Sequence, residues 1–162
     1  MLYQINNALL FFGVSFYMGT GWSTWIFQFP VIPKLTTADY YNHFIPQIAA
    51  ATDFFTFLVS MMILTGAIMI AGEWNTRFRW VPIVVVLCVI GATCLTVFII
   101  FPVNAILRNG ITDPQQLIDA LDKWVALTRI RAYIWSTEWL CMTYYFVSKA
   151  TTASSRSSTP RA

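Results

Sequence analysis

The stretch WVPIVVVLCVIGATCLTVFIIFPV, residues 80–103, contains no Asp, Glu, Lys, Arg or His. An apolar segment of this length can cross a bilayer as one helix, because about 20 residues at 1.5 Å each span the hydrocarbon layer. A helix is required there, since a segment that faces lipid must satisfy its own backbone hydrogen bonds. The stretch therefore predicts a transmembrane helix.

Three further apolar runs of similar length are found at residues 5–29, 48–71 and 124–147. Four prolines lie at the ends of the runs, where proline is expected to end a helix: Pro30, Pro33, Pro46 and Pro102. Asp113 and Pro114 precede the fourth run and are typical of a helix start. We therefore expect a long fourth helix that runs out of the membrane.

The composition agrees with a membrane protein, because 57% of the 162 residues are hydrophobic and 10% are charged, against about 25% charged in soluble domains. The first run has no Lys or Arg before it, so we interpret it as a retained span and not as a secretory signal. The sequence predicts an all-α, integral membrane four-helix bundle over residues 1–150. Residues 151–162 are mostly Ser, Thr, Arg and Pro, which predicts a disordered tail.

Lys and Arg near the span ends predict the orientation in a cell membrane. Five are expected on the side of the termini: Arg77, Arg79, Lys149, Arg156 and Arg161. Three are expected on the opposite side: Lys34, Arg108 and Lys123. This small excess favours cytoplasmic termini, although Arg129 and Arg131 reduce it.

Several function classes have no support in the sequence. The net charge of +3 includes no run of like charges, so no nucleic-acid partner is expected. There is one histidine, and the three cysteines lie in apolar runs without paired spacing, so we expect no metal site. Phosphate loops and hydrolase motifs are not found.

The fourth run carries aromatic and ionisable residues at a spacing of three and four, which places them on one helical face. They are Trp124, Thr128, Arg131, Trp135, Glu138 and Met142. We expect this face to point inward, with Asp53 as the partner of Arg131, because ionisable groups in a membrane usually face a partner. The pair would be either part of a site or an ion pair that sets helix register.

Two further ionisable residues leave alternatives open. Glu138 is expected to be a proton acceptor or a hydrogen-bonded acid. His43 lies in an aromatic segment typical of the membrane interface, and a ligand or catalytic role is the alternative, since histidine changes charge near neutral pH.

Four short motifs resemble one protein family. They are Phe29-Pro30-x-x-Pro33, Phe44-Ile45-Pro46, Pro102-x-Asn104-x-x-Leu107 and Trp124-x-x-x-Thr128-x-x-Arg131. Over about residues 9–148 the chain resembles the anthrone-oxygenase-like family of small four-helix membrane proteins, many of them catalogued as a domain of unknown function. Thr128 departs from the family pattern, which usually has Asn or His there.

The resemblance implies oxidation of an anthrone-like aromatic substrate by molecular oxygen, without a metal or flavin cofactor. In such a site Trp124 and Trp135 would stack on the ring, and Thr128 and Glu138 on the same helical face would also bind the substrate. Arg131 and Asn104 would hold the oxyanion. Asp53 or His43 would take the proton.

Two other functions fit the same residues. The 7 Trp, 7 Tyr and 13 Phe would suit a non-enzymatic accessory subunit that packs against a membrane partner or a second copy of itself. A small transporter would use Asp53, Glu138 and Arg131 as a polar path. In that case Gly19-Thr20-Gly21 is the one hint of a broken helix.

Overall fold

The computed structural model describes residues 1–157, with the side chains of residues 1–152. Four helical rods account for nearly all of this part of the chain, which contains no strand. The prediction of an all-α fold with four helices is therefore confirmed. The elements of the rods are α1 (Leu2–Ser23) with η1 (Thr24–Gln28), α2 (Tyr40–Glu73), α3 (Trp80–Leu95) with η3 (Thr96–Ile100) and α4 (Phe101–Arg108), and α5 (Pro114–Ser157).

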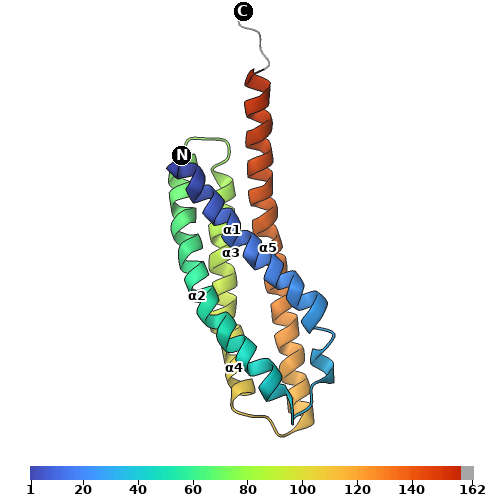
Figure 1. The fold of residues 1–162 in the computed structure, drawn as a ribbon. Helices are drawn as coiled ribbons and strands as arrows, with labels where there is room; N and C mark the ends of the chain where they lie inside the picture. Colours follow the sequence, from blue (N-terminus) through green and yellow to red (C-terminus); the bar gives the residue numbers. More distant parts are fainter. Residues whose placement is uncertain (158–162) are drawn as a thin grey trace, which may run out of the picture.

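The rods alternate in direction (Figure 1). The N-terminus and the α2–α3 loop lie at one end, here called the N-terminal end. The α1–α2 connection, with the short helix η2 (Ile32–Lys34), and the α4–α5 loop lie at the other. α5 is the long helix that the sequence predicted, since its 44 residues amount to about 66 Å. The Asp113 carboxylate accepts a hydrogen bond from the Gln115 N–H at 3.1 Å and so caps its first turn.

Two of the four prolines do not end a helix as expected. Pro46 lies inside α2, which already begins at Tyr40, so the predicted start of the second run is too late. Pro102 is near the start of α4, where a missing N–H costs little because the first-turn N–H groups lack helical partners. The π-helical turn η3 precedes it, and together they continue the third rod to Arg108.

The predicted tail begins at residue 151, but α5 continues without a break through Ser157. Residues 158–162, the rest of the predicted tail, lie outside the described residues. The polar composition of residues 151–157 therefore does not stop a helix that is already nucleated and packed upstream.

The apolar core divides into two clusters. The first core cluster lies toward the N-terminal end and includes Leu10, Leu58, Met62, Val89 and Met142. The second core cluster lies toward the other end and includes Tyr40, Phe44, Ile100, Leu107 and Trp124. The candidate site is found between them.

Two rods, residues 40–73 and residues 80–108, are long and apolar enough to cross a membrane. α1 and α5 contain more polar residues, but several of these face inward, such as Asn7 and Glu138. Large apolar side chains are exposed on the outside of α1 and α5 as well, among them Phe12 and Leu140. Each of the four rods thus exposes some large apolar side chains.

Candidate functional site

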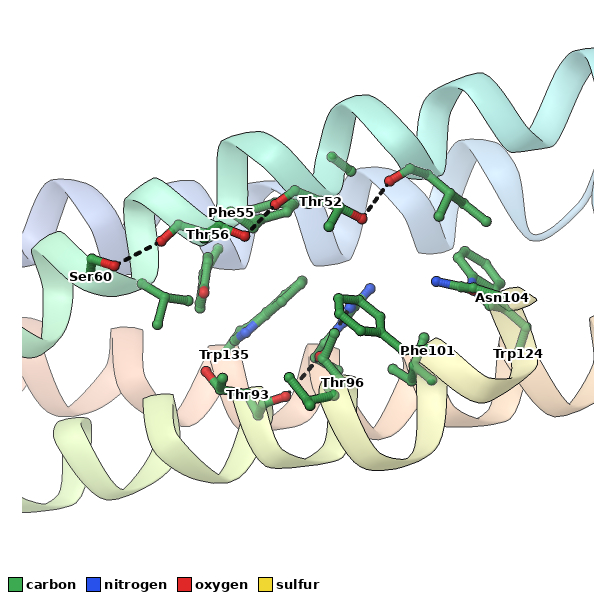
Figure 2. Close-up of a pocket in the computed structure, with 18 residues that line it drawn as sticks. Thr52, Phe55, Thr56, Ser60, Thr93, Thr96, Phe101, Asn104, Trp124 and Trp135 are labelled. Carbon is green, nitrogen blue, oxygen red and sulfur yellow. Dashed lines mark hydrogen bonds between the residues drawn. The ribbon is translucent and has the colours of Figure 1, made fainter. Parts of the chain in front are cut away.

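A cavity of about 300 Å³ lies inside the bundle between the two core clusters. α2 forms one wall, and the rod of α3, η3 and α4 forms the opposite wall (Figure 2). α1 and α5 contribute Tyr17, Trp124, Arg131 and Trp135. Three of the residues predicted on the inward face of the fourth run therefore line one cavity.

Aromatic rings form much of the cavity wall. The Trp135 ring centre lies 4.6 Å from that of Tyr17 and 5.8 Å from that of Phe55. Toward the other end of the cavity, Trp124 packs edge-on against Phe44, with ring centres 4.8 Å apart. Flat, apolar surfaces of this kind suit a flat, apolar ligand.

Arg131 is the cation of the cavity. Its Nη1 atom lies 3.4 Å from the Thr96 hydroxyl, a long hydrogen bond, and its guanidinium carbon lies 4.7 Å from the centre of the Trp135 ring. The Nε atom is buried and has no hydrogen-bond partner among the described residues. Arg131 therefore enters the cavity with an unused donor.

The predicted pairing of Arg131 with Asp53 is not formed. Asp53 is exposed on α2, while Thr52, Phe55 and Thr56 of the same helix face the cavity. Since successive helical residues are rotated by about 100°, Asp53 points away from the face that its neighbour Thr52 presents to the cavity. The ion pair found in the described part of the chain joins Lys149 and Glu73 instead.

Hydroxyl groups line α2 along the cavity. Thr52, Thr56 and Ser60 each donate a hydrogen bond to the carbonyl four residues earlier, at 2.8, 2.8 and 3.0 Å. Thr93 and Thr96 do the same on the opposite wall, at 2.7 and 2.8 Å. With their protons engaged, these hydroxyls offer lone pairs to a ligand.

Two more polar groups of the lining lack partners. The Asn104 Oδ1 atom and the Trp135 Nε1 atom are buried without a hydrogen bond to any described residue. Buried polar atoms are usually paired. Together with Arg131, they give the cavity both donors and acceptors that a ligand can use.

Thr128 and Glu138 are buried behind the lining, at 1% and 0% exposure. The Thr128 hydroxyl and both Glu138 carboxylate oxygens have no hydrogen-bond partner among the described residues. Glu138 lies one helical turn beyond Trp135 on α5. Glu138 is therefore next to the cavity without being part of its wall.

His43 does not reach the cavity. It is exposed in the first turn of α2, with Nδ1 3.0 Å from the Asp39 carbonyl oxygen. The neighbouring Asp39 carboxylate accepts the Thr36 N–H at 2.8 Å, which holds the pKa of Asp39 below its usual value. The predicted candidates thus separate into those at the cavity, Arg131 and Asn104, and those outside it, Asp53 and His43.

A second polar cluster, which the sequence analysis does not predict, lies at the N-terminal end. Glu73, at the end of α2, accepts hydrogen bonds from the Tyr3 hydroxyl at 2.9 Å, the Tyr145 hydroxyl at 2.6 Å and Lys149 at 2.7 Å. Its other oxygen accepts the Thr76 hydroxyl at 2.6 Å. Because these partners come from α1, α5 and the α2–α3 loop, sequence spacing alone does not bring them together.

Two asparagines of α1 extend this cluster. Asn7 donates to the Tyr145 hydroxyl at 3.1 Å, and Asn6 donates to the Thr65 carbonyl at 2.9 Å. Glu73 is thus fully engaged, unlike Glu138. The cluster ties three rods together, whereas Asn104, Arg131 and Trp135 at the cavity keep unpaired polar atoms.

Fold and site define an all-α, four-helix protein with an aromatic internal cavity that holds an arginine. No family model, curated protein or solved structure matches the chain. Within the described residues, no three His, Cys, Asp or Glu side chains lie close enough to hold a metal ion.

Proposed function

We propose that the chain is an integral membrane protein with four spans and with both termini on the cytoplasmic side. The two long apolar rods support this location. So do the large apolar side chains exposed on every rod, such as Phe12, Phe57, Phe98 and Leu140. In water this much exposed apolar surface would be unfavourable, whereas lipid would cover it.

We further propose that the cavity binds a flat aromatic compound that carries an acidic or carbonyl oxygen. One observation carries this proposal: Arg131 is a cation inside an aromatic cavity, with no carboxylate partner in the described chain. An unpaired charge away from water is costly, so a partner is expected. An anionic oxygen on the ligand would supply it.

The reaction proposed is the oxidation of such a ring by molecular oxygen, as the resemblance to the anthrone-oxygenase-like family implies. Loss of one proton from the CH₂ carbon of an anthrone gives an electron-rich anion. The anion and oxygen form a C–O bond, the resulting hydroperoxide loses water, and one anthrone and one O₂ become one anthraquinone and one H₂O. Arg131, supported by Asn104, would stabilise the anion by fixed charge and hydrogen bonding.

Glu138 is the proton acceptor in this proposal. It is the carboxylate on the same face of α5, one turn from Trp135, and both of its oxygens are without described partners. Asp53 and His43 are less suited, because both are exposed on the outer surface of α2, whereas Glu138 is buried behind the cavity wall. A general base has to come within hydrogen-bond reach of its proton, directly or through one water.

The test is oxygen consumption and quinone absorbance when the purified protein in lipid nanodiscs meets anthrone. Arg131→Ala should lose the turnover that exceeds the spontaneous rate. Arg129→Ala is the matched control, because Arg129 is exposed and stacks on Trp25, 5.0 Å from the ring centre, away from the cavity lining. Wild-type protein with no turnover would remove the oxygenase proposal and favour an accessory subunit.

A further inference from the structure

The cavity is open on the side of the bundle and not at its ends. Four of its lining residues are also exposed on the outer surface: Thr56 and Ser60 of α2, Val97 of η3 and Phe101 of α4. Figure 2 shows the labelled Thr56, Ser60 and Phe101 on the two facing rods that border the cavity. These four residues are here called the rim.

The opening follows from the π-helical turn. α2 packs against α3 and against α4, but hardly against η3, which lies between them. A π-turn is wider than an α-turn and locally displaces the helix, and such turns are frequent at functional sites. On the α2 side the rim residues are small, so no bulky side chain closes the gap that η3 leaves.

Packed side chains close both ends of the cavity. Toward the N-terminal end, Leu58, Met62 and Val89 of the first core cluster are at most 2% exposed. Toward the other end, Ile100 and Leu107 of the second core cluster are at most 1% exposed. A ligand arriving along the bundle axis from water would have to displace these side chains.

We propose that the ligand enters sideways, from the hydrocarbon interior of the bilayer, through the rim. This inference rests on the proposed membrane location and on the proposed ligand binding. The two rods that form the rim are the ones long and apolar enough to span a membrane. The rim therefore faces lipid and not water. Entry from lipid narrows the substrate class to flat ring compounds that dissolve in the membrane. Such a compound would bring its polar oxygen to Arg131 at the back of the cavity.

A lipid acyl chain is a poorer occupant. It would fill the space, but it would leave Arg131 Nε, Asn104 Oδ1 and Trp135 Nε1 buried without partners. Each buried polar group left without a partner destabilises the complex. A ring with one acidic or carbonyl oxygen would pair at least the arginine.

The experiment measures how fast a coloured probe, 1,8-dihydroxyanthraquinone, binds to the wild-type protein and leaves it, by stopped-flow absorbance in lipid nanodiscs. Val97→Trp narrows the rim, and Leu87→Trp is the matched control, since Leu87 is exposed on α3 and does not line the cavity. We expect Val97→Trp to slow association and dissociation alike, by about tenfold, with little change in Kd. Leu87→Trp should behave as wild type.

A second arm varies the amount of lipid at constant protein. A ligand that dissolves in the membrane predicts a Kd that is constant as a mole fraction in the bilayer, so that the Kd rises in bulk units as lipid is added. Wild-type rates in Val97→Trp, or no probe binding, would overturn entry through the rim. A bulk Kd that does not change with added lipid would overturn the membrane-soluble substrate class. The binding rates and the Kd do not depend on turnover. A failure of the oxygenase chemistry would therefore be seen separately, in the anthrone assay.

Discussion

The guanidinium carbon of Arg131 lies 4.7 Å from the ring centre of Trp135, one helical turn further along α5. The ring face attracts the cation by about 0.5–2 kcal/mol, much less than a carboxylate would in the same surroundings. Trp135 thus orients the guanidinium without neutralising it. The charge stays available to a ligand in the cavity.

Replacing Arg131 should weaken ligand binding. Arg131→Ala is expected to raise the Kd of 1,8-dihydroxyanthraquinone by about ten- to a hundredfold, because hydrogen bonds to charged groups contribute about 1.5–3 kcal/mol. Arg131→Lys keeps the charge but loses the planar donors, so its Kd should lie between that of the wild type and that of Arg131→Ala. Absorbance titration in nanodiscs measures the Kd of each protein. Equal affinity in the wild type and both variants would contradict the role of Arg131 in ligand binding.

Glu138 should reduce stability while serving activity. Its buried oxygens lack described partners, so Glu138→Met, of similar size, is expected to raise the free energy of unfolding by about 1–3 kcal/mol. The same variant should lose anthrone turnover. Thermal unfolding in detergent and oxygen consumption are the measurements, and a destabilised Glu138→Met would mean that the carboxylate is paired.

Glu73 is expected to behave in the opposite way. Glu73→Ala removes the acceptor of the Tyr3, Tyr145 and Lys149 hydrogen bonds, so it should lower the free energy of unfolding by about 3 kcal/mol. Asp122→Ala, on the exposed face of α5, is the control and should change it by less than about 0.5 kcal/mol. Equal melting temperatures for the two variants would show that the cluster contributes no stability.

Two glycines of α1 form a matched pair. A Cβ atom at Gly21 would lie 2.9 Å from the Trp135 ring and 3.2 Å from the Ala132 Cβ, whereas one at Gly19 would meet nothing within 4 Å. Gly21→Ala should therefore destabilise the fold by about 1–3 kcal/mol and disturb the cavity wall. Gly19→Ala should stabilise it by about 0.5–1 kcal/mol, as alanine favours helix.

Thermal unfolding compares the two glycine variants, and intrinsic tryptophan fluorescence reports on the wall at Trp135. A Gly21→Ala protein as stable as Gly19→Ala would show that α1 and α5 can separate without loss. In that case the close approach at Gly21 would not position the cavity.

Much of the fold was predictable because its signals are local. The four apolar runs, the Asp113 cap and the long fourth helix all depend on residues near one another in sequence. The same holds for the face of α5 that carries Trp124, Arg131 and Trp135, since helical periodicity places these residues together whatever they pack against.

The rest depended on contacts between rods. The sequence predicts Asp53 beside Arg131 because ionisable groups in a membrane usually face a partner. The rotation of α2 instead presents Thr52 and Thr56 to the cavity. The rotation of a helix about its axis is set by the packing of its neighbours, and the nearly uniform apolar composition of α2 does not specify it. The hydrogen-bond partners of Glu73 were not predicted for the same reason, since Tyr3, Tyr145 and Lys149 lie on other rods.

The sequence by itself determined that this chain forms four helices, and that one of them carries an aromatic face with an arginine and a glutamate. Local periodicity and hydrophobicity are sufficient for that. Only the tertiary structure decided which polar groups meet: Glu73 is paired by side chains of α1, α5 and the α2–α3 loop, whereas Arg131 and Glu138 have no ion-pair partner in the described chain. The reason is that pairing depends on how each helix is rotated about its axis, which is set when the rods pack together.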